Sequence, residues 1–415
     1  MARFQDNRQR ARVLSIALTV IVLATIVSAT LFHFPPDKPL TGAENAFTPT
    51  PLTARNWFDG SFAKNAEAWM LRRFGLRGYA IRLANQLDYS LFGKLPESRG
   101  TGVIRGKDGW LYENTYRRFY EGQYSVRDEQ ADLLARQLSI IQKLLAERGT
   151  RLVVVIAPSK LEVYPEYLPD VIVRKSTSTP AREQIARALE KHNVPLVDAH
   201  SIFLDWKQDK TVPLLFPKCG THWNAYGAQR IFDEILKAAG MEDSIPHVIG
   251  YEFNPPLGTD SDLLRLLNIP FYKYSAQVPY PLLSKTPAPS GKRLRSLLVG
   301  DSFSYQLIDA MGRTGSFSNA RFVYYLRSIF DFSWEGNERL RTTSPEGRRT
   351  AAITDHQAID WNEFLAGYDI LILEFNEIFS RDFLWGFAQF ALDGLSSQPP
   401  PDARKQLGSP EKGMP

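Results

Sequence analysis

Two short segments of the sequence carry residue types that could perform nucleophilic catalysis. The first is an apolar run, Leu297–Val299, that ends in Gly300, Asp301 and Ser302 before a predicted helix. A serine at such a corner stands above the edge of a sheet, and its own N–H can point at an oxyanion from the start of a helix. Ser302 is therefore the predicted nucleophile, with Gly300, Asp301 and Ser302 as the oxyanion turn. Taken alone this signal is weak, because most Gly-Asp-Ser tripeptides are turns or helix caps.

The second segment is Thr221-His222-Trp223-Asn224, which precedes another predicted helix. A serine hydroxyl is a poor nucleophile until an imidazole accepts its proton, so Ser302 requires a histidine. His222 is one of six histidines and lies in a loop between polar and aromatic residues, which suits a base. A lone histidine before a tryptophan is more often structural. The catalytic prediction therefore depends on the two segments together.

Side chains next to these two segments are candidates for contact with a sugar. Aromatic rings can stack on the faces of sugars, although the same rings often pack between helices. The predicted substrate-binding residues are Trp223, Asn224, Tyr226 and Tyr305. Asn376 is a weak candidate for a second oxyanion donor.

Strands that alternate with helices must position these residues. Predicted helices are 130–147, 181–192 and 225–239, and predicted strands are 151–158, 195–198, 296–300 and 369–375. This alternation predicts an α/β domain in which helices cover both faces of a central parallel sheet, with chemistry at the carboxyl ends of the strands. We expect one domain over residues 55–390. Within residues 65–92, Trp69, Phe74, Leu83, Leu87 and Leu91 have helical spacing and predict a buried stripe.

The amino terminus predicts a membrane anchor. Val13–Phe32 contains no charge and is about long enough to cross roughly 30 Å of hydrocarbon. Four arginines precede it, which favours a cytoplasmic tail at residues 1–12, an anchor at 13–33 and the remainder outside the cytoplasm. A cleaved signal peptide is the alternative, because Val27-Ser28-Ala29 resembles a cleavage site. Residues 34–54 predict an extended linker, and residues 391–415 a disordered tail.

Composition excludes several classes of function. The formal charge of +5 comes from scattered basic residues, which argues against a nucleic-acid partner. The single cysteine, Cys219, can form no internal disulfide. It precedes His222 by three positions, too close for easy nucleophile–base geometry, and no second ligand pattern supports a metal. We expect no metal and no cofactor.

The order of several motifs carries a resemblance to a known family. Asp59-Gly60-Ser61-Phe62, Gly109-Trp110-Leu111-Tyr112, Val154–Pro158, Thr221–Asn224 and Gly300–Phe303 occur in sequence. In this order the chain resembles the periplasmic alginate O-acetyltransferases of the AlgJ and AlgX kind, which carry an SGNH-hydrolase-like (flavodoxin-like) three-layer domain. The resemblance implies Ser302 as acyl nucleophile and His222 as its base. It also implies acetyl transfer to an exported, alginate-like polysaccharide, with a membrane-bound O-acyltransferase as partner and acetyl donor, at the bacterial inner membrane and in the periplasm.

The chain departs from the family at one position. Where the family has an aspartate two residues before the histidine, this sequence has Gly220. Removing such an aspartate from a related triad costs about four orders of magnitude in turnover. Another acid could replace it, and the candidates are Asp198, Asp205, Asp209, Glu374 and Glu377. A water or a main-chain carbonyl could orient His222 instead, or the domain could bind polysaccharide or a membrane acyltransferase without turnover. An acetyl esterase stays open as well, because hydrolysis and transfer share the acyl-serine intermediate.

Overall fold

A computed structural model describes most of the chain and divides it into two units. The described residues are 2–32, 40–42, 48–73, 75–96, 102–122, 124–176, 179–241, 246–272, 276–284, 293–334 and 348–397. One unit comprises residues 1–103 with 264–274, and the other comprises residues 104–263 with 275–415. Contacts therefore divide the chain near Val103, whereas the predicted domain boundary lies at residue 55.

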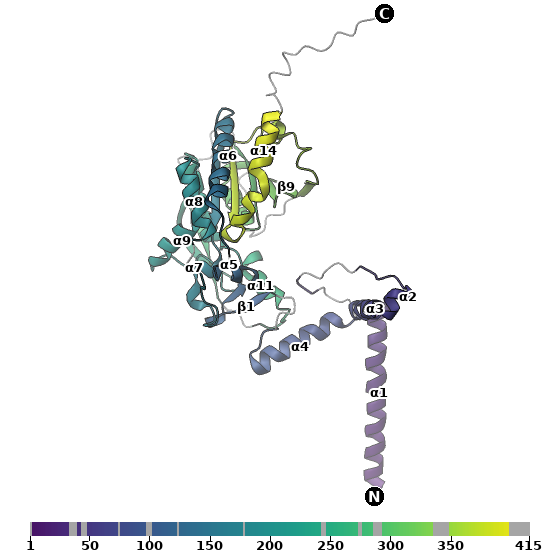
Figure 1. The fold of residues 1–415 in the computed structure, drawn as a ribbon. Helices are drawn as coiled ribbons and strands as arrows, with labels where there is room; N and C mark the ends of the chain where they lie inside the picture. Colours follow the sequence, from purple (N-terminus) through teal and green to yellow (C-terminus); the bar gives the residue numbers. More distant parts are fainter. Residues whose placement is uncertain are drawn as a thin grey trace, which may run out of the picture. The chain divides into compact units, whose positions relative to one another are not determined.

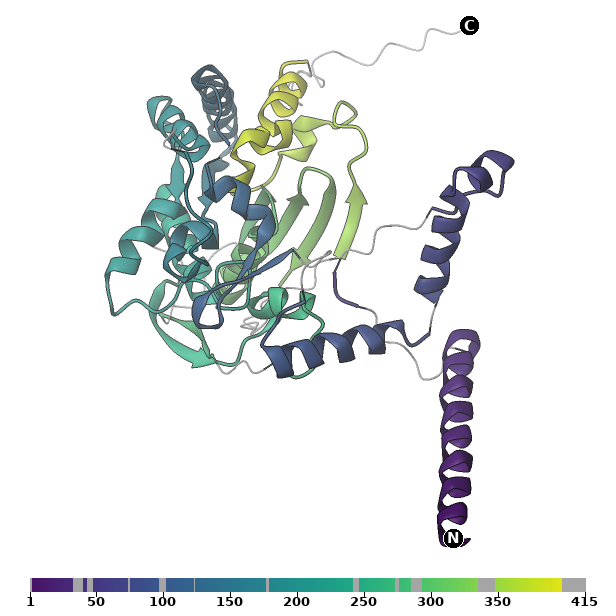
Figure 2. The same cartoon turned by 60° about the horizontal axis from the view of Figure 1, so that its bottom comes forward.

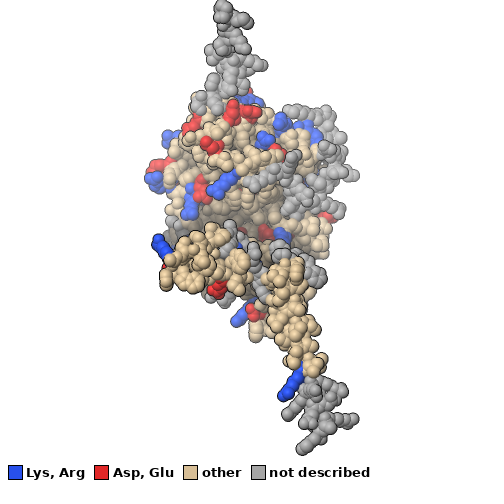
Figure 3. Space-filling model, turned by 90° about the vertical axis from the view of Figure 1, so that its right-hand side faces the viewer, with Lys and Arg blue, Asp and Glu red and all other residues tan. Residues whose placement is uncertain are grey.

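The first unit is helical and includes the predicted anchor. Its helices are α1 (Ala2–Phe32), α2 (Ala54–Phe58), α3 (Ser61–Arg73) and α4 (Arg77–Phe92). The segment Arg12–Phe32 has a mean hydropathy of 2.4 and is long enough to cross a membrane. After Arg12 this segment carries no charged side chain (Figure 3). Of the predicted linker, residues 34–39 and 43–47 lie outside the described residues, as does His33 at the end of the predicted anchor.

The predicted buried stripe in α3 and α4 is wrong. Trp69, Leu83, Leu87 and Leu91 are exposed, at 44%, 61%, 48% and 68% of their surface, and Phe74 lies outside the described residues. Helix α4 instead uses a different face for its contacts. The Asn85 side chain donates to the Leu267 carbonyl, and the Tyr89 ring stacks on Tyr272 with centroids 4.9 Å apart. Helical spacing is therefore correct, but it does not tell which face is covered.

A seven-stranded sheet forms the centre of the second unit. Its strands are β3 (Arg151–Ala157), β4 (Leu196–Asp198), β7 (Leu294–Gly300), β8 (Phe317–Tyr324), β9 (Ser328–Ser333), β10 (Arg348–Ala352) and β11 (Ile370–Asn376). They lie in the order β10-β9-β8-β7-β11-β3-β4. The five strands from β8 to β4 are parallel, whereas β9 and β10 add an antiparallel edge. The predicted parallel sheet is thus confirmed and extended; Figure 2 shows strands from the second half of the chain (green) side by side.

The last strand of the sheet lies in its middle. A flavodoxin-like sheet has the order 2-1-3-4-5, whereas here β11, the last in the chain, lies between β3 and β7. The chain leaves β8 through the antiparallel pair β9 and β10 and then returns to the centre through α13 (Trp361–Phe364). This return places the carboxyl end of β11 directly beside the turn that follows β7.

Helices cover both faces of the sheet, so the predicted three-layer α/β class is confirmed. Alternate residues of β3 illustrate this, because Val153 belongs to one buried cluster and Val154 to the other. The first cluster includes side chains of α9 (Ala199–Gln208), α10 (Ala225–Ala238) and α12 (Ser304–Thr314). The second includes side chains of α6 (Asp128–Ala146), α8 (Ala181–Lys191), α13 and α14 (Phe387–Ser397), and α6 lies between α8 and α14 (Figure 1). The sheet therefore lies between two buried clusters, one on each of its faces.

Smaller elements complete the second unit. The pair β1 (Val103–Arg105) and β2 (Leu111–Glu113) and the hairpin β5 (Val248–Asn254) and β6 (Val278–Leu283) are separate two-stranded sheets. Short helices are α5 (Arg117–Tyr120), α7 (Lys160–Val163) and α11 (Asp262–Leu266), of which α11 begins in this unit and ends in the first. The predicted disordered tail begins too early, because residues 391–397 continue α14 and Ala391 is fully buried against the core. Residues 398–415 of that tail lie outside the described residues.

Candidate active site

The turn after β7 holds Ser302 above the sheet. Asp301 is fully buried, and its two carboxylate oxygens accept the N–H groups of Phe303 at 2.8 Å and Asn376 at 2.7 Å. These bonds tie the turn to the end of β11, so Asp301 shapes the turn, as the sequence suggested. Gly300 has no room for a side chain, because a Cβ there would collide with Ser304 Oγ and Glu374 Oε2. Ser302 itself stays partly exposed at the carboxyl edge of the sheet.

Ser302, His222 and Asp262 form a continuous hydrogen-bonded relay. His222 Nε2 lies 2.8 Å from Ser302 Oγ, and His222 Nδ1 lies 2.9 Å from Asp262 Oδ2. Both distances are within the range of hydrogen bonds that a general base requires. Because an ionised carboxylate can only accept hydrogen bonds, Asp262 favours the tautomer in which His222 Nδ1 carries the proton. His222 Nε2 is then free to accept the proton of the serine hydroxyl.

The acid of this relay comes from a segment that the sequence analysis did not consider. Asp262 begins α11, in the connection between β5 and β6, forty positions after His222. Its Oδ1 accepts the N–H groups of Thr221 at 2.8 Å and Leu263 at 2.6 Å. Asp262 is therefore bound both to the histidine loop and to its own helix, which fixes the direction of the carboxylate.

Gly220 is glycine because this connection occupies the space of a side chain. A Cβ on Gly220 would lie 2.5 Å from the Thr259 carbonyl oxygen and 2.9 Å from the Asp260 carbonyl carbon. Real Cβ atoms do not approach main-chain atoms that closely, so a side chain at 220 requires the Thr259–Asp262 segment to move. The absent carboxylate at 220 and the carboxylate at 262 are thus two consequences of one packing arrangement.

The relay perturbs the pKa values of both ionisable members. Burial pushes the pKa of His222 down, but the hydrogen bond and charge of Asp262, with smaller contributions from Asp301 and Glu113, raise the pKa above its ordinary 6.5. Burial pushes the pKa of Asp262 up, but the bond to His222 and the two N–H groups lower the pKa below its ordinary 3.8. Asp262 is therefore ionised at neutral pH and stabilises the imidazolium form of His222.

A buried lysine supports the loop that carries His222. Lys160 Nζ lies 2.7 to 2.8 Å from four carbonyl oxygens, those of Leu111, Pro217, Lys218 and Gly220. Burial lowers the pKa of Lys160 to about 7, while the four carbonyl oxygens favour the protonated ammonium group. Lys160 thus holds the segment before His222 against β2.

A second buried carboxyl group lies beneath the turn. Glu374 Oε2 accepts the Asp301 N–H at 3.1 Å and the Ser304 hydroxyl at 2.7 Å. Burial and the charge of Asp301 raise the pKa of Glu374 well above its ordinary value. Through these two bonds Glu374 supports the turn that carries Ser302.

The other acids proposed for His222 have different partners. Asp198 contacts Arg182 and Ser201, and Asp209 accepts a hydrogen bond from Thr211, whereas Asp205 is exposed on α9. Glu374 accepts hydrogen bonds from Asp301 and Ser304. Glu377 contacts His200 and Ser159. None of the five therefore contacts His222 in the described structure. The Asn376 side chain donates to the Pro158 carbonyl at 3.0 Å, which does not favour it as an oxyanion donor.

Three of the four predicted substrate-binding residues support the site from within the fold. Trp223 is fully buried and donates to the Phe303 carbonyl, and Asn224 is fully buried and caps α10 through Gly227. Tyr226 is 6% exposed and packs on Tyr251. For Trp223 and Asn224 the prediction of sugar contact is wrong, because no part of either side chain reaches solvent. Tyr305 is half-buried beside Ser302 and stays a candidate.

An aromatic group that the sequence analysis missed lies at the same edge of the sheet. The Tyr325 ring contacts those of Phe379 and Trp385, with centroids 5.6 and 5.2 Å apart, and all three are half-buried. The Tyr325 N–H donates to the Gly300 carbonyl, so this group adjoins the Ser302 turn. The three rings are widely separated in the sequence from Gly300, and no local motif marks them.

The fold and the relay together define the class of domain. A parallel sheet with a serine, a histidine and an aspartate in contact at its carboxyl edge is the arrangement of hydrolase-like α/β domains. Residues 103–308 match the family model described as "SGNH hydrolase-like domain, acetyltransferase AlgX". Over this segment the chain belongs to the AlgX family of SGNH hydrolase-like domains, as its motifs indicated.

Several known proteins are similar to this chain in sequence or in structure. Two are named "Probable alginate O-acetylase AlgJ": one from Pseudomonas aeruginosa is 29% identical over 45% of this chain and 43% of its own length, and one from Pseudomonas putida is 23% identical over 59% and 65%. The chain thus spans less than two thirds of the length of these relatives. Among solved structures, the O-acetyltransferase domain of P. putida AlgJ aligns over 74% of this chain and 98% of its own, with 20% identity and a TM-score of 0.37. Pseudomonas aeruginosa AlgX aligns over 70% and 67%, with 14% identity and a TM-score of 0.40.

Proposed function

We propose that this protein is a serine-dependent O-acetyltransferase that modifies hydroxyl groups of an exported polysaccharide. The observation that carries the proposal is the Ser302–His222–Asp262 relay, whose two contacts are 2.8 and 2.9 Å. The family of the domain and the names of the relatives, which refer to alginate, favour acetyl transfer to a polymer of that kind.

The relay accounts for both halves of an acetyl transfer. In the first half, His222 Nε2 accepts the Ser302 proton while Oγ attacks the acetyl carbonyl carbon of the donor, and the imidazolium then returns that proton to the leaving group. In the second half, Nε2 accepts the proton of a sugar hydroxyl, whose oxygen attacks the acetyl carbon, and the proton passes back to Ser302 Oγ. Asp262 stabilises the imidazolium in both halves. The Ser302 N–H, which has no partner among the described residues, is the candidate oxyanion donor.

The amino-terminal helix suggests where the reaction takes place. We infer that α1 anchors the chain in the bacterial inner membrane, with the basic tail in the cytoplasm and the sheet unit in the periplasm. A membrane-bound O-acyltransferase is the proposed source of the acetyl group, because an anchored transferase can receive it at the membrane surface. The site residues bring their own base and acid, and the proposed reaction needs no cofactor.

An acetyl-transfer assay on the full-length protein in detergent tests the proposal. The protein is incubated with p-nitrophenyl acetate and an alginate oligosaccharide, and acetylated oligosaccharide is measured by mass spectrometry. We expect transfer by the wild type and by Ser284→Ala, a substitution on the β6 side of the hairpin, and no transfer by Ser302→Ala. Acetate release without acetylated sugar would favour an esterase, and equal activity of Ser302→Ala and wild type would refute the acyl-serine mechanism.

A further inference from the structure

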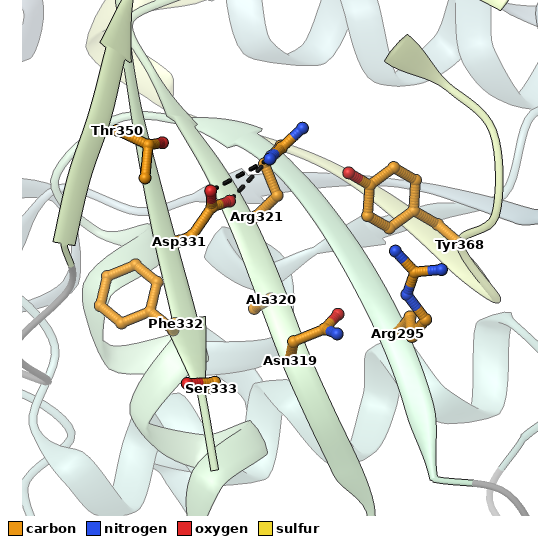
Figure 4. Close-up of a pocket in the computed structure, with 9 residues that line it drawn as sticks. All are labelled: Arg295, Asn319, Ala320, Arg321, Asp331, Phe332, Ser333, Thr350 and Tyr368. Atoms are coloured by element: carbon orange, nitrogen blue, oxygen red, sulfur yellow. Dashed lines mark hydrogen bonds and ion pairs between the residues drawn. The ribbon is translucent and has the colours of Figure 1, made fainter. Parts of the chain in front are cut away.

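The opposite edge of the sheet carries a polar pocket. Its volume is about 400 Å³, within the range of small-molecule sites. It is lined by side chains from β7, β8, β9 and β10 and by Tyr368, just before β11 (Figure 4). Arg295 is the second residue of β7, whereas Ser302 follows the end of that strand, so about 20 Å separate the pocket from the proposed nucleophile. The pocket is therefore distinct from the candidate active site.

The strands present polar side chains on this face where a covered sheet would have apolar ones. Phe332 and Ala320 face the buried cluster on the other side of the sheet, whereas Asn319, Arg321 and Asp331 point into the pocket (Figure 4). The alternation is that of a sheet with one face in water. These positions are thus available to a ligand.

The charge of the pocket is incompletely balanced. Arg321 and Asp331 form a two-bond ion pair, at 2.7 and 3.0 Å, and neutralise each other. The Arg295 guanidinium makes no hydrogen bond or ion pair within the described part of the chain, and its Nε is buried without a partner. The Arg295 Cζ atom lies 5.5 Å from the centre of the Tyr368 ring, within the range of a cation–π contact. Among the described residues that line the pocket, Arg295 is thus the charged side chain without an ion-pair partner.

We propose that this pocket binds a carboxylate-bearing sugar residue of the polysaccharide. A guanidinium with its donors free matches the two oxygens of a carboxylate, and one net positive charge matches one carboxylate better than a phosphate dianion. Asn319, Ser333 and Thr350 supply uncharged polar groups for sugar hydroxyls, and the Tyr368 ring supplies apolar surface.

The inference rests on the proposed function and specifies its substrate as an acidic polymer. A polymer held at two places on one domain meets the second site at a high effective concentration, so a weak uronate contact at Arg295 raises the affinity for the chain being acetylated. The pocket is thus an accessory subsite, and Arg295 has no part in the chemical step.

Binding of a short oligouronate to the full-length protein in detergent tests this inference. The background is Ser302→Ala, so that no turnover disturbs the measurement. Calorimetry gives the Kd, and hydrogen exchange locates the protection. We expect Arg295→Gln to weaken binding by about 10- to 100-fold, Asn319→Ala by a few-fold, and the oligouronate to protect the start of β7 and β8. Arg151→Gln is the matched control, because it removes an exposed arginine at the same edge of the sheet without lining the pocket, and it should bind as the parent does.

Several outcomes would overturn the inference. Equal affinity of Arg295→Gln and its parent, protection confined to the Ser302 turn, equally tight binding of a neutral oligosaccharide, or tighter Arg295-dependent binding of inorganic phosphate would each do so. Failure of the two proposals can be told apart. Arg295-dependent uronate binding by a protein without acetyl transfer would remove only the enzymatic proposal, and transfer without Arg295-dependent binding would remove only the accessory subsite.

Discussion

Replacing Asp262 by asparagine changes the proton positions of the relay with little change in its shape. The asparagine Oδ1 can still accept the N–H groups of Thr221 and Leu263, as the carboxylate does. Its amide nitrogen then faces His222 Nδ1 and can only donate. His222 must accept at Nδ1 and therefore carry its proton at Nε2, where it can no longer accept the proton of Ser302.

The expected loss follows from this change of tautomer. In serine triads the same replacement lowers turnover by about four orders of magnitude, which corresponds to about 5 kcal/mol of transition-state stabilisation. The free energy of unfolding should change by less than about 1 kcal/mol, because two of the three bonds to the side chain remain and the third is replaced by a neutral one. A large kinetic effect with a small effect on stability is the result that a merely structural Asp262 cannot produce.

The assay is acetyl release from p-nitrophenyl acetate by the full-length protein, followed across pH. Asp205→Asn is the matched control, since Asp205 is exposed on α9 and the same atoms are exchanged. We expect the control to retain wild-type activity. If Asp262→Asn kept activity within tenfold of wild type with an unchanged pH profile, the assignment of Asp262 as the acid of the relay would be refuted.

Three further results are expected. Gly220→Asp restores the acid position of the family. It should lower activity at least as much as Gly220→Ala, because the Cβ atom of either side chain displaces the Asp262 segment. Acetyl transfer by Gly220→Asp above that of the wild type would contradict this packing argument. Activity should rise with pH through the pKa of His222, which is raised above 6.5, because His222 must be neutral to accept a proton. The stability that His222 gains from its raised pKa follows the opposite trend: it is complete below pH 6.5 and is lost as pH rises through the folded pKa. Thermal unfolding of wild type and Asp262→Asn across pH 5 to 9 measures this second trend, and a parallel rise in the stability of the two proteins with pH would contradict the assignment. Lys160→Met should lower the free energy of unfolding by about 3 kcal/mol or more, because four carbonyl oxygens lose a buried donor. The control is Lys191→Met, which removes an exposed lysine. A loss below about 1 kcal/mol for Lys160→Met, similar to that of the control, would show that water replaces the ammonium group.

The strands buried on both faces were predictable, as was the short edge strand β4, whereas β8, β9 and β10 were not. Continuous apolar runs predict β3, β7 and β11 to within two residues, because strands covered by helices on both sides need apolar side chains at every position. Strands β8 and β9 alternate polar and apolar residues, and one of their faces opens to the Arg295 pocket. The polar side chains that line the pocket therefore interrupt the apolar run that would have predicted these two strands.

The exposed stripe in α4 marks a second limit of the sequence. The positions of Leu83, Leu87 and Leu91 predict a helix, and the helix is there. Burial depends on which neighbour packs against it, and the contacts of Asn85 and Tyr89 come from residues about 180 positions later in the chain. Spacing within one segment contains no information about such a partner.

Ser302 and His222 could be paired from the sequence because each lies directly after or before a regular element, and elements of this kind converge at one edge of a parallel sheet. Asp262 could not, since it lies in a connection between two strands of a hairpin outside that sheet and no spacing relates it to His222. The requirement on the acid is only that a carboxylate oxygen reach Nδ1, and any segment that packs against the histidine loop can meet it. Once the Thr259–Asp262 segment filled the space beside position 220, a carboxylate at 220 had no room, and one at 262 had the place that the chemistry requires. The acid can thus come from different places in the sequence, although the place of its carboxylate beside Nδ1 is fixed. A missing motif residue is therefore weak evidence against catalysis.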